Sequence, residues 1–502
     1  MARLSLCMIV RDEEERLARC LSSARSCVDE IVVVDTGSKD RTIAIAESFD
    51  ARVIPFTWCD DFAAARNASM EAARGDWLLF LDADETLSAE AGRELRRCMK
   101  DPRTLGAFIP LHDGGEGAPD TTTLLFRAVR RMDGVRWRYR IHEQLLPDAN
   151  RVARARNLRF AELTHGIEHD GYSHAVMASK QKRARNRRLF EAQLADTPDD
   201  PYILYKFGDF LRPDPDTHEE GQQLLRRAFD ALRRLPACEQ KELTFAGEVT
   251  ALLALGLLRQ GDSAAAADVL SFGETHCRPT GHLAFARGQQ LLATGDMAGA
   301  ERSFRACMAT GAGAFLIPAT ARVTSQLAPT GRAAALLGLG RAQEALALIA
   351  PLAALHPEDE DSLRIQAEAT FACGDARGAL GILTTALTRQ PRTGSLWLSG
   401  AQLLFRLKLA DKALDWVRRA RALGSAAVGT DGLEGEILLV AGDHNGAEAL
   451  FRGHGADARC QAGLLLLAEL RGDSTEAGVD ARIAAERERM RSNLRLSGAS
   501  SN

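Results

Sequence analysis

Two aspartates that follow a run of apolar residues are the part of this sequence best suited to chemistry. Residues 77–81 are all apolar, and Asp82-Ala83-Asp84-Glu85 follows them directly. A short apolar run is typical of a strand buried on both faces, and ligands bind beyond the carboxyl ends of strands in a parallel α/β sheet. Two carboxylates at that position would suit Mg²⁺ or Mn²⁺ carrying a diphosphate. The alternative is a pair of aspartates that cap the next helix, and this pattern alone leaves both interpretations open.

The elements that would position these aspartates alternate between strands and helices. Apolar runs predict buried strands over 4–10, 31–34, 52–56 and 77–81. Helical patterns predict helices over 13–24, 39–48 and 61–73. We expect one buried face on the first helix, made of Leu17, Cys20, Leu21 and Ala24, and we expect Ser38 to cap the second. Regular alternation predicts a mostly parallel sheet with right-handed crossovers.

Two further residues could meet a nucleotide at the same edge of the sheet. Asp35 ends the second predicted strand, and its carboxylate could accept hydrogen bonds from a uracil ring or a ribose hydroxyl. Its alternative role is to begin the turn over 36–40. Arg66 lies on the helix that leads into the strand over 77–81 and could contact nucleotide or phosphate. A lone arginine on a helix is more commonly a solvated surface residue.

Four ordered motifs occupy residues 6–13 (LCMIVRDE), 34–42 (VDTGSKDRT), 62–67 (FAAARN) and 81–85 (LDADE). They resemble the successive signatures of family-2 glycosyltransferases, which have the GT-A fold, and the resemblance covers about residues 3–190. It implies an inverting transferase that uses a nucleotide-sugar donor, with a UDP-sugar favoured, and a divalent metal, Mn²⁺ or Mg²⁺.

The same resemblance implies roles for single residues. Asp35 would contact the base, Asp82 the ribose or the metal, and Asp84 the metal. The donor-binding set that we expect is Val10, Asp12, Glu13, Asp35, Arg66, Asp82 and Ala83.

A candidate acceptor side follows further along the chain. Additional strands are predicted over 106–110 and 123–127, and the alternation of apolar and basic residues over 136–145 predicts a half-buried strand that ends at His142-Glu143. The Ile-His-Glu-Gln-Leu sequence resembles a subgroup of family 2 that places it beside the acceptor. An inverting transfer needs a base to take the proton of the acceptor. Glu143 is our candidate and His142 the second choice, and the alternative for Glu143 is a structural carboxylate.

The segment 165–172 (HGIEHDGY) resembles the His-x-Gly-Tyr element of the same subgroup. His169 could then be a metal ligand beside Asp82 and Asp84, since imidazole binds Mn²⁺. Alternatively, His169 packs against Tyr172.

The second half of the chain is periodic. Turn positions recur at Gly261, Gly295, Gly340, Gly374, Lys408 and Gly442, at intervals of 34, 45, 34, 34 and 34 residues, and an alanine follows each by five residues. A helix–turn–helix repeat of this length is the tetratricopeptide signature. The longer interval predicts an 11-residue insertion within 311–332. Such repeats stack into a superhelix whose concave face binds extended partners.

We therefore expect an α/β GT-A (Rossmann-like) domain over 1–175, a helical linker over 176–198 that carries the basic run 179–188, an all-α tetratricopeptide superhelix over 199–485, and a tail over 486–502.

The net charge of −4 gives no reason to expect a nucleic-acid partner. Ten scattered cysteines without a Cys-x-x-Cys pair argue against zinc and disulfide frameworks. No apolar run reaches membrane-spanning length, and no signal-peptide core is evident, so we expect a cytoplasmic protein.

The main functional hypothesis is a glycosyltransferase whose repeats recruit a peptide or protein acceptor. The Ile-His-Glu motif also resembles sublancin-type peptide S-glycosyltransferases and transferases that build lipopolysaccharide core, so a glycan acceptor is an alternative. A repeat scaffold with an inactive transferase domain is a second alternative, and the intact set of Asp35, Asp82, Asp84 and Glu143 argues against it. A nucleotidyltransferase would carry a glycine-rich loop after the first strand, where 11–14 is instead mostly acidic. The sugar, the acceptor atom and the oligomeric state stay open.

Overall fold

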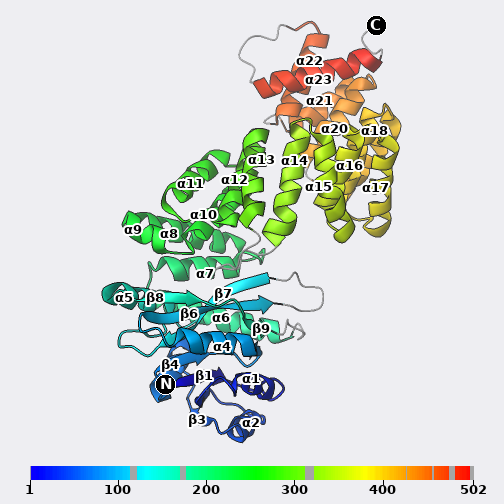
Figure 1. Cartoon of the computed structure of the whole chain (residues 1–502). Coiled ribbons are helices and arrows are strands. Elements are labelled where there is room, and N and C mark those ends of the chain that lie inside the picture. The colour runs from blue at the N-terminus through cyan, green and yellow to red at the C-terminus, as the bar shows by residue number, and fades with distance from the viewer. Residues whose placement is uncertain are drawn as a thin grey trace. The chain divides into compact units, whose positions relative to one another are not determined.

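A computed structural model describes residues 2–113, 121–169, 177–310, 322–425, 427–454, 457–473 and 481–497. The chain forms two compact units, Met1–Ala328 and Pro329–Asn502 (Figure 1). The first unit holds an α/β domain and the first helices of the repeat region. The second holds the later helices.

Four parallel strands form one half of the sheet, in the order β3-β2-β1-β4. They are β1 (Leu4–Val10), β2 (Glu30–Asp35), β3 (Arg52–Pro55) and β4 (Trp77–Phe80). The apolar runs predicted these strands, and their side chains fill the core on both faces of the sheet. The register pairs Val10 with Asp35, so the carboxyl ends of β1 and β2 lie side by side.

The other half of the sheet is mixed, but five of the eight strand pairings among the described residues are parallel, so the prediction of a mostly parallel sheet is confirmed. The additional strands are β5 (Glu85–Leu87), β6 (Thr104–Asp113), β7 (Thr121–Arg130), β8 (Arg159–Glu162) and β9 (Ile167–His169). β7 pairs antiparallel with both β4 and β6. β9 pairs antiparallel with β5 and places His169 opposite Glu85.

The helices of the α/β domain are α1 (Leu17–Ala24), α2 (Thr42–Ser48), α3 (Phe62–Ala72), α4 (Ala89–Cys98) and α5 (Leu146–Arg156). The predicted buried face of α1 is confirmed. α1 begins at Leu17, later than predicted, and the backbone N–H of Glu13 donates to Thr42 Oγ1 at 2.7 Å. The prediction that Ser38 caps α2 is wrong. The Ser38 hydroxyl accepts a hydrogen bond from the Asp12 N–H, and an Asp40 turn precedes Thr42.

Helices form the rest of the first unit. They are α6 (Met177–Asp196), α7 (Pro201–Leu211), α8 (His218–Arg234), α9 (Ala237–Glu242), α10 (Ala246–Arg259), α11 (Ser263–His276), α12 (Gly281–Thr294), α13 (Met297–Ala309) and the π-helix η2 (Val323–Leu327). The second unit contains α14 (Ala328–Gly338), α15 (Ala342–Leu355), α16 (Glu360–Ala372), α17 (Ala376–Arg389), α18 (Gly394–Arg406), α19 (Ala410–Ala422), α20 (Ala427–Val440), α21 (His444–Gly453), α22 (Ala458–Leu470) and α23 (Ala481–Ser497).

The predicted repeat period is confirmed by the turns between helices. The five predicted glycines and Lys408 adopt positive φ, between 65° and 96°, at the end of the first helix of a hairpin. Glycine tolerates this conformation without a steric cost. The six alanines that follow by five residues are all fully buried, which lets the two helices of a hairpin approach closely: Ala266, Ala300, Ala345, Ala379, Ala413 and Ala447. Residues 311–321, where the insertion was expected, lie outside the described part of the chain.

Candidate functional site

Arg66 links the first aspartate of the Asp-x-Asp motif to the candidate base. Its NH2 group donates to Asp82 Oδ1 at 2.9 Å, and its Nε donates to Glu143 Oε1 at 2.6 Å. The Arg66 guanidinium also lies 5.0 Å from the ring centroid of Trp137. Arg66 is buried, with 6% exposure, so the alternative of a solvated surface arginine is wrong.

The short helix α3 places Arg66 at the end of β4. Asp61 begins α3 as its N-cap and accepts a hydrogen bond from the Ala64 N–H at 2.9 Å. Arg66 follows one turn later and faces the sheet. Burial alone would lower the pKa of Arg66, but the carboxylates of Asp82 and Glu143 outweigh it and hold the pKa above the usual range.

A second arginine holds Asp82 from the opposite side. Arg127 on β7 donates to Asp82 Oδ2 at 2.9 Å and also pairs with Glu85. Glu85 in turn accepts a hydrogen bond from the Asp82 N–H at 2.9 Å. Burial would raise the pKa of Asp82, but the guanidinium groups of Arg66 and Arg127 hold that pKa well below its ordinary value. Glu85 has a raised pKa, first because of burial.

The sequence interpretation missed the roles of Glu85 and Arg127, although a signal for Arg127 was present. Arg127 interrupts an otherwise apolar stretch of β7, whose neighbours Phe126, Ala128 and Val129 lie in or against the core. Arginine is rarely buried without a partner. A charged residue at such a position therefore predicts a buried carboxylate beside it.

The segment that carries Glu143 is a loop, and the prediction of a strand over 136–145 is wrong. Arg138 and Gln144 form an isolated antiparallel bridge, and between them Tyr139 and His142 have φ of 74° and 52°. These left-handed conformations turn the backbone out of the extended path of a strand. The alternating apolar residues of this segment belong to a tight loop, in which Trp137 and Ile141 are buried.

The first helices of the repeat region hold this loop. The Tyr139 hydroxyl donates to Asp200 Oδ2 at 3.0 Å, and the His142 ring stacks on Phe190 of α6 with centroids 5.5 Å apart. Burial lowers the pKa of His142 to about 4, and the nearby Lys206 charge adds to this effect. His142 is therefore a neutral packing residue near pH 7, which weakens it as the second candidate for the base.

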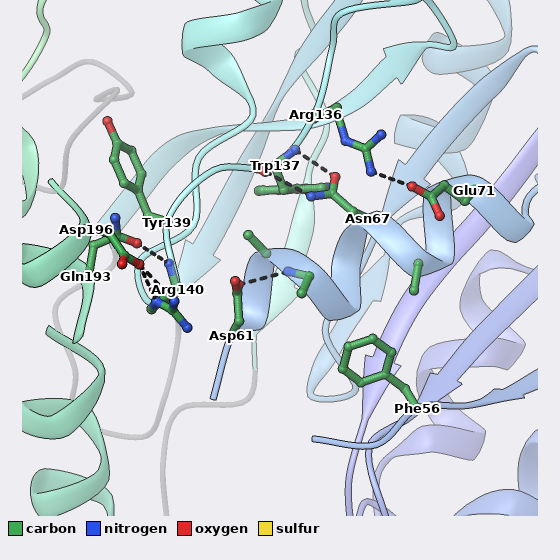
Figure 2. A pocket seen from close by; sticks show the side chains of 13 residues that line it. Phe56, Asp61, Asn67, Glu71, Arg136, Trp137, Tyr139, Arg140, Gln193 and Asp196 are labelled. Atoms are coloured by element: carbon green, nitrogen blue, oxygen red, sulfur yellow. Dashed lines mark hydrogen bonds and ion pairs between the residues drawn. The ribbon is translucent and has the colours of Figure 1, made fainter. Parts of the chain in front are cut away.

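A small pocket of about 460 Å³ lies behind the loop, between α3 and α6 (Figure 2). Its polar side chains pair with one another. Asn67 exchanges two hydrogen bonds of 3.0 Å with the Trp137 backbone, and Arg140 pairs with Asp196 at 2.8 Å. Glu71 pairs with Arg136 at the rim. These contacts fix the loop on both sides of Trp137, and so they support the position of Arg66 and Glu143.

The edge of the sheet that is predicted to bind the nucleotide-sugar donor lies where β1 and β2 end. Asp35 is buried, and its carboxylate accepts hydrogen bonds from the N–H groups of Gly37 at 3.0 Å and Ser38 at 3.2 Å. Asp35 therefore does shape the turn after β2. The Lys39 N–H donates to Asp12 Oδ1 at 2.7 Å and ties the loop after β1 to this turn. The structure thus brings Asp12 and Asp35, with Val10 beside them, to one edge of the sheet.

The residues that fit a divalent metal are Asp84 and His169. His169 Nε2 lies 3.3 Å from Asp84 Oδ2, because the β5–β9 pairing brings the two segments together. Glu13 lies near Asp84. Its pKa is raised mainly by burial and secondly by the negative charge of Asp84. Within the described ranges, no three His, Cys, Asp or Glu side chains are grouped closely enough to hold a metal ion. Both carboxylate oxygens of Asp82 pair with arginines, Oδ1 with Arg66 and Oδ2 with Arg127. Ala83 is buried between the two aspartates. Tyr172, the alternative partner for His169, lies outside the described residues.

A large cleft of about 1110 Å³ lies beside these residues. It is lined by residues of the sheet domain and of the first repeat helices. Arg66, Asp82 and Glu143 lie at one part of its wall. Among the helices that the structure describes, none is both long and apolar enough to cross a membrane.

Comparisons with known proteins agree with this geometry. Residues 5–149 match the family model described as Glycosyl transferase family 2, and this range contains Asp35, Arg66, Asp82, Asp84 and Glu143. The chain is 40% identical over 271 residues to a TPR repeat-containing protein of Synechococcus elongatus, a match that covers 53% of this chain and 65% of that protein. It is 27% identical over 229 residues to the prophage-derived glycosyltransferase SunS of Bacillus subtilis, covering 45% of this chain and 53% of that protein.

The chain therefore spans less than two thirds of the length of these curated relatives. Among solved structures, S. aureus TarS in complex with UDP-GlcNAc is 16% identical, with 54% of this chain and 92% of that chain covered and a TM-score of 0.35. Residues 5–149 are therefore similar to family 2 glycosyltransferases, and helical hairpins with tetratricopeptide-type turns follow them along the chain.

Proposed function

We propose that this protein is an inverting, metal-dependent glycosyltransferase that moves a sugar from a nucleotide-sugar donor to a peptide or protein acceptor. The observation that carries the proposal is the linked set of Asp82, Arg66 and Glu143 at the carboxyl end of β4. It lies inside the region that matches the family model. A UDP-sugar is the favoured donor, with Asp35, Asp12 and the backbone near Val10 at the base and ribose end.

Glu143 is the proposed general base. Arg66 holds its Oε1, and within the described residues its Oε2 has no hydrogen-bond partner. In the proposed step the acceptor heteroatom attacks the anomeric carbon while its proton passes to Glu143 Oε2. The bond from the anomeric carbon to the diphosphate oxygen breaks, and the nucleoside diphosphate leaves. Attack opposite the leaving group inverts the anomeric centre.

A divalent metal would be held by Asp84 and His169. An imidazole ligand suits Mn²⁺ better than Mg²⁺, which prefers oxygen ligands. When bound, the metal would supply positive charge for the diphosphate leaving group. Asp82 is fixed between Arg66 and Arg127, and we assign it to orienting Arg66 and the donor ribose rather than to the metal alone.

The repeat helices support a role in acceptor recruitment, because stacked hairpins of this type commonly bind extended segments. All ten cysteines are free thiols, which supports a reducing, cytoplasmic location.

The test is to incubate the purified full chain with a series of UDP-sugars and Mn²⁺. Release of UDP measures donor turnover, and NMR of the released sugar gives its anomeric configuration. We expect turnover of one donor with inversion, and loss of turnover in EDTA. Retention of configuration would refute the inverting mechanism, full turnover in EDTA would refute metal dependence, and no turnover of any donor would refute the transferase.

A further inference from the structure

The large cleft beside Glu143 has two walls of different origin. One wall comes from the sheet domain and includes Phe126 of β7 and Leu145 of the Glu143 loop. The other comes from α7 and the segment between α9 and α10, and includes Tyr202, Lys206 and Phe245. Its volume of about 1110 Å³ exceeds the roughly 300–1,000 Å³ typical of small-molecule sites. The cleft therefore has room for a ligand larger than the donor sugar.

Three residues that line this cleft each have a buried donor atom without a partner. Arg66 NH1, Arg127 Nε and Trp137 Nε1 are buried and make no hydrogen bond within the described residues. Arg66 and Trp137 are 6% and 7% exposed, so water does not readily satisfy them. A buried donor without a partner costs free energy, and an acceptor oxygen of a ligand would reach these atoms only after neighbouring side chains move.

Lys206 adds a positive charge to the helical wall. Its ammonium lies 4.8 Å from the ring centroid of Tyr205 and 5.9 Å from that of Tyr202. Among the described residues it makes no ion pair within 4.0 Å. Burial lowers the pKa of Lys206, although Asp209 and Glu248 oppose the effect. A half-buried ammonium surrounded by aromatic rings is ready to pair with an anionic group of a ligand.

The rest of the helical wall mixes apolar residues with the acidic residues Glu239 and Glu242. Leu235, Leu243 and Phe245 line it, and Arg154 pairs with Glu242 at 2.6 Å across the cleft between α5 and α9. Aliphatic side chains offer no partner for the hydroxyl groups of a glycan. An extended peptide instead supplies apolar side chains for Leu235, Leu243 and Phe245, and a carboxylate for Lys206.

We propose that this cleft binds an extended acidic peptide as the acceptor, with the modified residue at Glu143 and a neighbouring Asp or Glu of the peptide paired with Lys206. This inference rests on the proposed transferase function. It assigns α7 and the α9–α10 segment to the acceptor site itself, beside the catalytic residues.

The test uses the full chain with synthetic peptides that carry one Cys, Ser, Thr or Asn, flanked by apolar residues and by either Asp or its neutral isostere Asn. Sugar transfer is measured by mass spectrometry, and donor hydrolysis is measured in parallel as UDP release. We expect modification of at least one peptide, and a preference of roughly tenfold for its Asp form, as for one strong charged contact.

Two variants examine the helical wall. Lys206→Met should reduce the preference for Asp peptides to about one, while Leu243→Glu should weaken transfer to all of them relative to donor hydrolysis. Lys241→Met is the matched control, because Lys241 is exposed on α9 and does not line the cleft. Thermal melting checks that each variant folds.

Three results would overturn the inference. They are donor hydrolysis without modification of any peptide, transfer only to glycan or lipid acceptors tested alongside, and an unchanged Asp preference in folded Lys206→Met. In all three the proposed donor chemistry survives, because UDP release persists, although the first two results also remove the peptide acceptor from the proposed function. Absence of UDP release with every donor would instead remove the proposed function, and this inference with it.

Discussion

Replacement of Arg66 by methionine is the most informative perturbation of the site. Arg66→Met keeps a long side chain against Trp137 but leaves the carboxylates of Asp82 and Glu143 without the cation that lies between them. Removal of one partner from a buried ion pair typically costs about 3–5 kcal/mol. Arg127 still holds Asp82, so we expect the lower end, about 3 kcal/mol of unfolding free energy.

The pH dependence of the loss separates this cause from poor packing. In the wild type the pKa of Asp82 is depressed, so its contribution to stability is present above the unfolded pKa and is lost as pH falls through the folded pKa. Without Arg66, the two carboxylates repel each other, and the pKa of one of them should rise above its unfolded value. That group then contributes stability at low pH and loses it as pH rises. The deficit of Arg66→Met should therefore be smaller at pH 5 than at pH 7.

Urea unfolding at both pH values measures the deficit. Arg74→Met is the matched control, since Arg74 is an exposed arginine just after α3, and surface changes usually fall within about 0.5 kcal/mol. Equal stability of Arg66→Met and Arg74→Met, or a deficit of Arg66→Met that does not change with pH, would refute the argument that Arg66 neutralises a buried pair.

Further predictions concern turnover and stability. Glu143→Gln should lower turnover by roughly 10²–10⁴-fold with nearly unchanged donor affinity by calorimetry, and near wild-type turnover would move the base elsewhere. Asp84→Ala should abolish the response of turnover to Mn²⁺ while the melting temperature of the protein without metal stays close to wild type. Tyr139→Phe removes the hydrogen bond to Asp200 and should reduce turnover more than UDP affinity, whereas equal loss of both would argue against loop anchoring. Since burial lowers the pKa of His142 to about 4 from 6.5, the unfolded chain binds the proton first, so stability should fall as pH drops between these values. His142→Gln should remove that part of the pH dependence.

The parts of the fold that the sequence predicted well are those set by local patterns. Buried apolar runs identified β1 to β4, and the spacing of Leu17, Cys20, Leu21 and Ala24 identified the buried face of α1. Positive φ at the repeat turns follows from glycine itself. These features depend on neighbouring residues and so are visible in a single sequence.

The predictions that failed depend on distant partners. The segment before α1 is instead a loop that is bonded to a distant turn, since the N–H groups of Asp12 and Glu13 donate to Ser38 and Thr42. The loop over 138–144 departs from a strand because α6 and α7 provide Phe190 and Asp200 as its supports. No local pattern encodes such contacts, since they form only when segments far apart in the sequence pack together.

In the candidate site, too, local patterns were predicted from the sequence and contacts between distant residues were not. The Asp-x-Asp motif predicted a site at this edge of the sheet, and Asp84 Oδ2 and His169 Nε2 lie 3.3 Å apart there. The pairing of Arg66 with Glu143 joins residues 77 positions apart and could not be inferred from either alone. A lone arginine on α3 became a central residue only because α3 lies between β4 and the Glu143 loop.

The central claim is that this edge of the sheet binds a nucleotide sugar together with a metal. Thermal melting of the full chain with a series of nucleotide sugars, with and without Mn²⁺, tests it most directly, because a ligand at 100 times its Kd stabilises the folded state by about 2.7 kcal/mol. We predict a rise in Tm for at least one nucleotide sugar, dependent on Mn²⁺ and absent in Asp84→Ala. No rise with any nucleotide sugar, or an equal rise in Asp84→Ala, would contradict the claim.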